Sequence, residues 1–185
     1  MRLILLGAPG SGKGTQGDAL ADRFGVRHVS TGELLRRHIA EQTELGRLAQ
    51  PYVRGGELVP DDIVLQMAGA EVIEAAAEGG YVLDGFPRTL DQAERAYELA
   101  TPAGVTADAV VYLAVPDDVA RARLLGRDEG RADDADPEVI ERRLRVFHEQ
   151  TEPLLDFYRG RGILVTVDAV PPPEQVTAAM LAALA

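Results

Sequence analysis

A glycine-rich stretch near the amino terminus constrains the fold more than any other part of this 185-residue chain. Residues 7–15 read GAPGSGKGT, directly after the apolar run LILL at residues 3–6 and directly before a helical pattern. A strand, a glycine loop and a helix in this order bring backbone N–H groups and the positive end of the helix to one point. The stretch therefore predicts a site for a phosphate group, although Gly14 stands where a hydroxyl residue usually follows the lysine.

Lys13 strengthens this prediction because it is the only lysine of the chain, all other basic residues being arginines. A compact ammonium fits inside a phosphate-filled loop where a planar guanidinium does not. The alternative is a glycine-rich turn beside a surface lysine. It leaves unexplained why the glycine spacing, the lysine, the strand and the helix occur together.

The composition argues against several classes of protein. A formal net charge of −11 disfavours nonspecific binding of nucleic acid or of an anionic membrane surface, since both need a basic face. The chain has no cysteine, so it can form neither a disulfide nor a thiolate zinc site. It starts with a strand, without a charged leader or a bilayer-spanning apolar segment, so we expect a monomeric cytoplasmic protein.

Short apolar runs that alternate with helical patterns predict an α/β fold of three layers with a five-stranded parallel sheet. The expected strands are residues 3–6, 26–29, 81–84, 109–115 and 163–167. Ligands bind such sheets at the carboxyl ends of the strands. Between the second strand and residue 59 the pattern predicts two helices and no strand, the first opened by a capping box at Ser30 and Glu33. Asp61 is expected to cap the long helix that follows.

We therefore expect a single domain over residues 1–185 with two appendages. The core is predicted to comprise residues 1–29, 60–126 and 137–185. The appendages are a helical insertion of residues 30–59 and a short polar lid of residues 127–136.

A second motif, DGFPR at residues 84–88 followed by Gln92, comes directly after the third strand. Asp84 is placed to hold Mg²⁺, directly or through water, beside the phosphate loop. Arg88 offers a planar fork for a second phosphate group, and Gln92 an amide able to contact the edge of a base. A role for Asp84 as a helix cap is the alternative, but it does not account for Arg88 and Gln92.

These motifs resemble those of the adenylate kinase family, in the same order and at the same spacing. The resemblance rests on the glycine loop, on STGELLR at residues 30–36, on LVPD at residues 58–61 and on DGFPR with Gln92, and it covers nearly the whole chain. It implies reversible phosphoryl transfer from Mg-ATP to AMP, giving two ADP, for adenine nucleotide balance. The alternatives are a UMP or CMP kinase of the same family and a nucleotide-binding switch that transfers nothing.

The resemblance also implies roles for individual residues. ATP is expected to contact Gly10, Ser11, Gly12, Lys13, Gly14, Thr15, Arg123 and Arg127. AMP is expected to contact Thr31, Arg36, Glu57, Leu58, Val59, Gly85, Arg88, Gln92, Arg131 and Arg143. The catalytic set, which stabilises the transferring phosphoryl group, is Lys13, Arg88, Arg127, Arg131 and Arg143.

The chain departs from the family pattern at several positions. Glu57 stands where some members carry lysine. The stretch before residue 137 is far shorter than the lid of long-form members, so the chain resembles the short-lid form, and we expect Mg²⁺ but no zinc. The choice of Arg143 over Arg142 as the residue facing the phosphates stays open.

Overall fold

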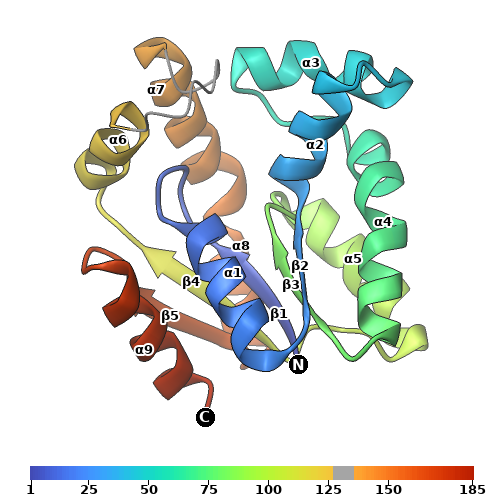
Figure 1. Cartoon of the computed structure of the whole chain (residues 1–185), viewed down its shortest axis with the longest axis vertical. Coiled ribbons are helices and arrows are strands. Elements are labelled where there is room, and N and C mark those ends of the chain that lie inside the picture. Colours follow the sequence, from blue (N-terminus) through green and yellow to red (C-terminus); the bar gives the residue numbers. More distant parts are fainter. Residues whose placement is uncertain (127–135) are drawn as a thin grey trace.

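The computed structural model describes residues 1–126 and 136–185, which form a five-stranded parallel sheet between helices (Figure 1). The strands run in the order β2-β3-β1-β4-β5. Their bounds are Arg2–Leu6 for β1, Arg27–Ser30 for β2, Tyr81–Asp84 for β3, Ala109–Ala114 for β4 and Leu164–Asp168 for β5. The predicted fold class, with its five-stranded parallel sheet, is confirmed.

The apolar residues of the central strand β1 point alternately to two core layers, as the two-residue period of a strand requires. Leu3 and Leu5 pack with α1 (Lys13–Phe24) and α9 (Pro173–Ala183). Ile4 and Leu6 belong to the opposite layer, which includes residues of α4 (Asp61–Ala77), α5 (Leu90–Ala103) and α8 (Leu154–Gly160). Both faces of the sheet are therefore covered, as buried parallel sheets require.

Two further helices, α2 (Thr31–Ala40) and α3 (Glu44–Gly55), lie between β2 and α4 with no strand between them. Figure 1 shows them beyond the carboxyl ends of the strands. The backbones of α2 and α3 approach closely at Gly46, where a Cβ atom would lie 2.0 Å from the carbonyl oxygen of His38. Thr43 caps α3 by accepting a hydrogen bond from the N–H of Gly46.

A third cluster of buried apolar residues packs against the glycine loop. It joins Ala8 of the loop to α6 (Asp117–Leu125) and α7 (Pro137–Val146) through buried apolar residues such as Leu124 and Leu144. Helix α7 continues into a π-helical turn, Phe147–Thr151, before α8 begins. This turn interrupts the regular helix directly ahead of Pro153.

The predicted capping interactions at Ser30 and Asp61 are wrong. Ser30 precedes α2, but its hydroxyl donates to Oδ2 of Asp84 (3.5 Å), its partner in the β2–β3 register, and makes no cap bond. Asp61 is itself the first residue of α4, and Pro60 occupies the capping position. In both cases the side chain that was predicted to cap a helix makes a tertiary contact instead, Ser30 with Asp84 and Asp61 with Gln92.

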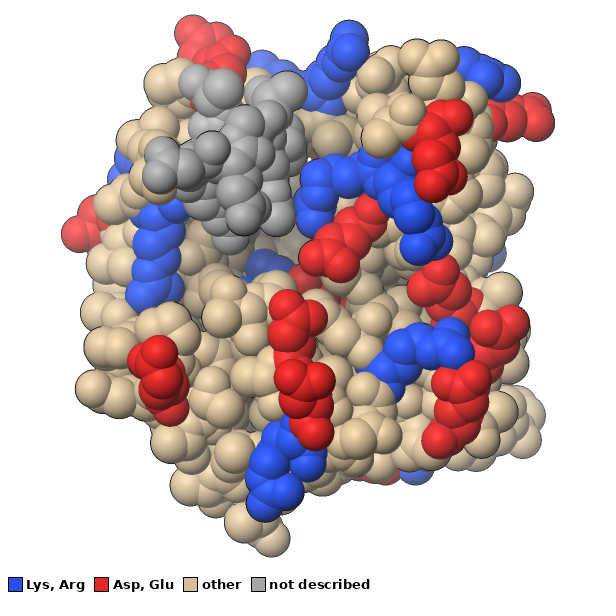
Figure 2. Space-filling view, in the orientation of Figure 1, with Lys and Arg blue, Asp and Glu red and all other residues tan. Residues whose placement is uncertain are grey.

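Charges of both signs are interspersed on the face drawn in Figure 2, rather than forming one continuous basic surface. This distribution agrees with the formal net charge of −11. Among the helices that the structure describes, none is both long and apolar enough to span a bilayer.

The contact at Gly46 predicts that its replacement is costly. Gly46→Ala places a methyl group against a backbone carbonyl, which cannot move aside as a flexible side chain can, so the free energy of unfolding should fall by about 1–3 kcal/mol. Gly69→Ala in α4 is the matched control, because apart from the adjoining residues and backbone of α4 itself, no described atom lies within 4 Å of its added Cβ. Alanine there should raise stability by about 0.5–1 kcal/mol. Urea unfolding of both variants measures the difference, and equal effects would contradict the close packing of α2 and α3.

His148 predicts a pH dependence of stability. Its Nδ1 lies 2.8 Å from Glu152 and its Nε2 lies 3.0 Å from Asp117; the Glu152 contact above all raises the pKa of His148 above its ordinary 6.5. A raised pKa means that the charged imidazole stabilises the fold below about pH 6.5, and that this contribution is lost as pH rises through the raised value. His148→Gln should therefore melt below the wild type at pH 6 by up to about 4 °C, with a smaller difference at pH 8. A difference that stays constant between these pH values would contradict the assignment.

Candidate functional site

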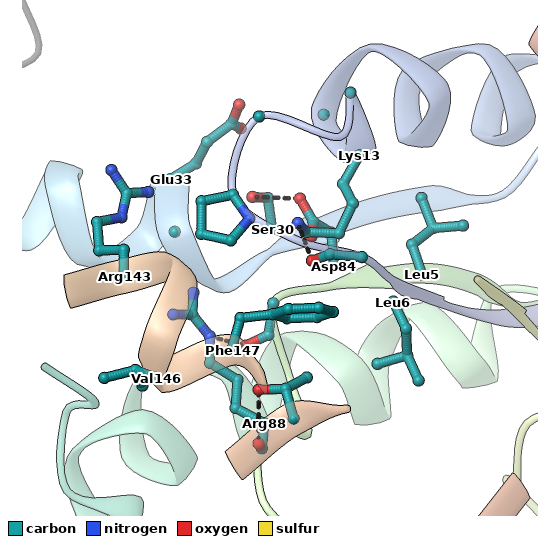
Figure 3. A pocket seen from close by; sticks show the side chains of 18 of the residues that line it. Leu5, Leu6, Lys13, Ser30, Glu33, Asp84, Arg88, Arg143, Val146 and Phe147 are labelled. Carbon is teal, nitrogen blue, oxygen red and sulfur yellow. Dashed lines mark hydrogen bonds between the residues drawn. The ribbon is translucent and has the colours of Figure 1, made fainter. Parts of the chain in front are cut away.

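A cavity of about 490 Å³ opens at the carboxyl edge of the sheet. It is bordered by the glycine loop, the end of β3, the start of α2, the segment after α3 and the α7 end with its π-helical turn. In Figure 3 the side chains of Lys13, Asp84, Arg88 and Arg143 come from separate segments of the chain and line the same space. The parallel arrangement of the strands brings these segments together, because all their carboxyl ends lie at one edge.

The glycine loop keeps its shape because two of its residues need a conformation that other residues avoid. Gly10 has φ 83° and passes so close to α6 that a Cβ atom would lie 2.4 Å from the carbonyl oxygen of Ala120. Gly12 has φ 96° and directly precedes α1. Within the described residues no side chain caps this helix, so its first N–H groups are left for an anion in the cavity.

Lys13 lies across the loop that precedes it. Its Nζ donates hydrogen bonds to the carbonyl oxygens of Gly7 (2.8 Å) and Ala8 (3.0 Å). Gly10, Gly12, Gly14 and Thr15 line the cavity together with Lys13. Ser11 differs from them, since its hydroxyl is buried beneath the loop without a hydrogen-bond partner in the described part of the chain.

Asp84 ends β3 with a buried side chain that faces the cavity. Its Oδ2 accepts a hydrogen bond from Ser30 (3.5 Å), and its backbone carbonyl accepts one from the hydroxyl of Thr31 (3.2 Å). Residues 1–126 and 136–185 contain no group of three or more His, Cys, Asp or Glu side chains placed to hold a metal ion. Mg²⁺ is usually held by one or two carboxylates together with water and substrate phosphates, so the buried carboxylate of Asp84 fits this ion.

Positive charge gathers around Arg88 at the base of the cavity. Its Nε donates to the carbonyl oxygen of Gly85 (2.8 Å), which directs the guanidinium into the site. Burial lowers the pKa of Arg88, the carboxylate of Asp84 opposes this, and the neighbouring Arg143 and Arg36 lower the pKa further. A bound anion would relieve this crowding of cations, so the site favours a multiply charged ligand such as a phosphate ester.

The two neighbouring arginines of α7 point to different places. Arg143 lines the cavity. Arg142 donates instead to the carbonyl oxygen of Gly55 at the end of α3 (2.8 Å), and its Nε lies 3.8 Å from Glu57.

A second, smaller cavity of about 80 Å³ adjoins the first beneath α2. Gln92 lines it with an almost fully buried side chain, and Gly85 forms part of its wall. Gly85 has φ 84°, and a Cβ atom there would lie 2.3 Å from the hydroxyl oxygen of Thr31, so glycine is required for this approach. Of the residues expected to contact AMP, those in this wall are Thr31, Arg36, Glu57, Leu58, Val59, Gly85, Arg88, Gln92 and Arg143.

Some expected site residues are not brought to these cavities. Within the part of the chain that the structure describes, Arg123 stands apart from both, and its guanidinium donates to the carbonyl oxygen of Val170 (3.0 Å). Arg127 and Arg131 lie outside the described residues.

Sequence patterns alone missed several residues of the site, among them Phe147 and Thr151. Both line the larger cavity, and the hydroxyl of Thr151 donates to the carbonyl oxygen of Arg88 (2.8 Å). Together with Arg143 they recur every four residues along one helical stretch, and this spacing is the signal that could have found them.

The chain is similar to known proteins over its whole length. A family model described as adenylate kinase matches residues 5–163. A Nocardia farcinica protein named adenylate kinase is 47% identical over 184 residues, covering 100% of this chain and 99% of the relative. One from a Synechococcus strain is 48% identical over 177 residues, covering 95% and 91%. One from Streptomyces avermitilis is 40% identical over 213 residues, covering 100% and 97%. The extent of these matches shows that the chain belongs to the adenylate kinase family.

Proposed function

We propose that the protein catalyses reversible phosphoryl transfer from Mg-ATP to AMP, giving two ADP. One observation carries this proposal: Arg88 and Arg143 line both the cavity of the glycine loop and the smaller cavity of Gln92. Two nucleotide sites that share their cations allow one phosphoryl group to pass between them. The names of the full-length relatives agree with this activity.

In this proposal each cavity takes one nucleotide. The ATP phosphates bind at Gly10, Ser11, Gly12, Lys13, Gly14 and Thr15, with Arg123 and Arg127 also contacting ATP. AMP binds at Thr31, Arg36, Glu57, Leu58, Val59, Gly85, Arg88 and Gln92, with Arg131 and Arg143. The position of Arg143 in the cavity, and of Arg142 outside it, supports the choice between these two arginines.

The chemistry needs alignment and positive charge rather than a base. The acceptor is a phosphate oxygen of AMP that is already anionic near neutral pH, so no side chain has to remove a proton. Lys13, Arg88 and Arg143, with Arg127 and Arg131, stabilise the oxygens that gain charge during transfer. Asp84 would hold Mg²⁺ through water, and the bound ion would neutralise charge on the ATP phosphates.

Water has to be excluded, because an open site would hydrolyse ATP. Residues 30–59 and residues 127–136 are the proposed movable covers, hinged on a core of residues 1–29, 60–126 and 137–185. Closure would bring Arg131 onto phosphates that Arg143 already faces. We further propose that the protein acts as a cytoplasmic monomer.

A direct assay tests the activity. The protein is incubated with Mg-ATP and each nucleoside monophosphate, and the products are separated. AMP should exceed UMP, CMP and GMP by at least about tenfold in kcat/KM, roughly 1.4 kcal/mol of differential transition-state binding. Equal or faster turnover of UMP would assign the chain to a UMP or CMP kinase. If no nucleoside monophosphate were phosphorylated, the chain would instead be a nucleotide-binding switch.

The two arginines of α7 form a matched pair for testing the catalytic assignment. Arg143→Ala removes a charge-stabilising donor from the cavity and should lower kcat by about two to three powers of ten. Arg142→Ala removes the contact with Gly55 and should change kcat by less than about threefold. Steady-state kinetics at saturating nucleotides give both values. A larger loss from Arg142→Ala would reverse the assignment.

A further inference from the structure

Gln92 is held by two hydrogen bonds that fix the direction of its side-chain amide. Oε1 accepts a hydrogen bond from the backbone N–H of Arg88 (2.7 Å), and Nε2 donates one to Oδ1 of Asp61 (2.5 Å). Gln92 is 4% exposed and lines the smaller cavity. Asp61 is not one of the described residues that line this cavity, so it acts on a ligand there only through Gln92.

Rotating the amide of Gln92 by half a turn would break both contacts. Nε2 would then face the N–H of Arg88, donor against donor, and Oε1 would face the carboxylate of Asp61, acceptor against acceptor. Because the side chain is buried, water does not replace the lost partners, and each unpaired group costs free energy. The amide therefore has one stable orientation.

The Asp61 side chain and the backbone of Arg88 hold this orientation before any ligand binds. Asp61 is the first residue of α4, and Gln92 lies in the first turn of α5, where its N–H donates to the capping Thr89 (3.2 Å). The third partner is the main chain of Arg88, whose carbonyl is in turn held by Thr151. The contact between Asp61 and Gln92 thus joins the starts of two helices at the wall of the cavity.

We propose that Asp61 is a positioning residue that makes the smaller cavity select adenine over 6-oxopurine bases. This inference rests on the proposed function, in which AMP occupies that cavity. A glutamine amide has two N–H donors and two acceptor lone pairs, so one donor and one acceptor remain for the base. Adenine offers an amino donor at C6 beside a ring-nitrogen acceptor, and the fixed amide matches both.

A 6-oxopurine such as hypoxanthine or guanine reverses this pattern. Its C6 carbonyl is an acceptor and would face the acceptor Oε1 of Gln92. Its N1 carries a hydrogen and would face the donor Nε2. A site built for one hydrogen-bond pattern discriminates strongly against a ligand that leaves its buried groups unpaired. IMP is the sharpest probe, because its base differs from that of AMP only at these two positions.

The test compares the wild type with Asp61→Asn and with Asp62→Asn as the matched control. An asparagine can donate or accept, so it removes the penalty that Asp61 places on the reversed Gln92 amide and leaves only the N–H of Arg88 to fix the orientation. Asp62 is exposed in the same first turn of α4, so its variant makes the same charge change without the contact to Gln92. Values of kcat/KM for AMP and for IMP are measured at saturating Mg-ATP. The AMP-to-IMP ratio should fall at least about fivefold in Asp61→Asn and stay within about twofold in Asp62→Asn.

The outcomes separate this proposal from the proposed function. An unchanged ratio in folded Asp61→Asn, or an equal fall in Asp62→Asn, would overturn the role of Asp61 while leaving AMP phosphorylation intact. If Asp61→Asn does not fold, Asp61→Ala, which leaves Nε2 without its acceptor, should show the same fall, and an unchanged ratio there would overturn the role as well. A wild type that does not phosphorylate AMP would instead overturn the proposed function.

Discussion

The folded chain has to hold several positively charged side chains around one enclosed space. Burial lowers the pKa of the Arg88 guanidinium, Asp84 opposes this in part, and the neighbouring Arg143 and Arg36 lower the pKa further. The surrounding structure supports this arrangement: a parallel sheet buried on both faces, a loop wedged against α6, and main-chain carbonyls that fix Arg88 and Lys13. The site is thus prepared for a polyanion although the chain as a whole is strongly acidic.

The sequence predicts the sheet and the loop because these depend on local patterns. Apolar runs locate the strands, and the glycine spacing with Lys13 locates the phosphate site, since backbone conformation near each glycine is set within a few residues. Capping was predicted less well. Ser30 turned to Asp84, 54 residues away, because the β2–β3 register places the two side by side.

Contacts between distant segments could not be predicted from the sequence. Asp61 and Gln92 are 31 residues apart, and Arg88 and Thr151 are 63 apart, so their pairing depends on how α4, α5 and the π-helical turn after α7 pack. The sequence also does not determine which face of α7 points to the cavity. Two adjacent arginines differ by about 100° around a helix, and only packing decides which one faces the cavity.

The π-helical turn at Phe147–Thr151 decides which side chains of this stretch face the cavity. Arg143, Phe147 and Thr151 line one cavity at four-residue steps, whereas four residues of a regular α-helix overshoot a full turn by about 40°. The π-helical turn holds more residues per turn than an α-helix. It therefore offsets this rotation and keeps all three side chains on one face. If the same residues formed a regular α-helix instead, Thr151 would rotate by about 100° and lose its contact with Arg88, so that contact depends on the extra residue that the wide turn holds.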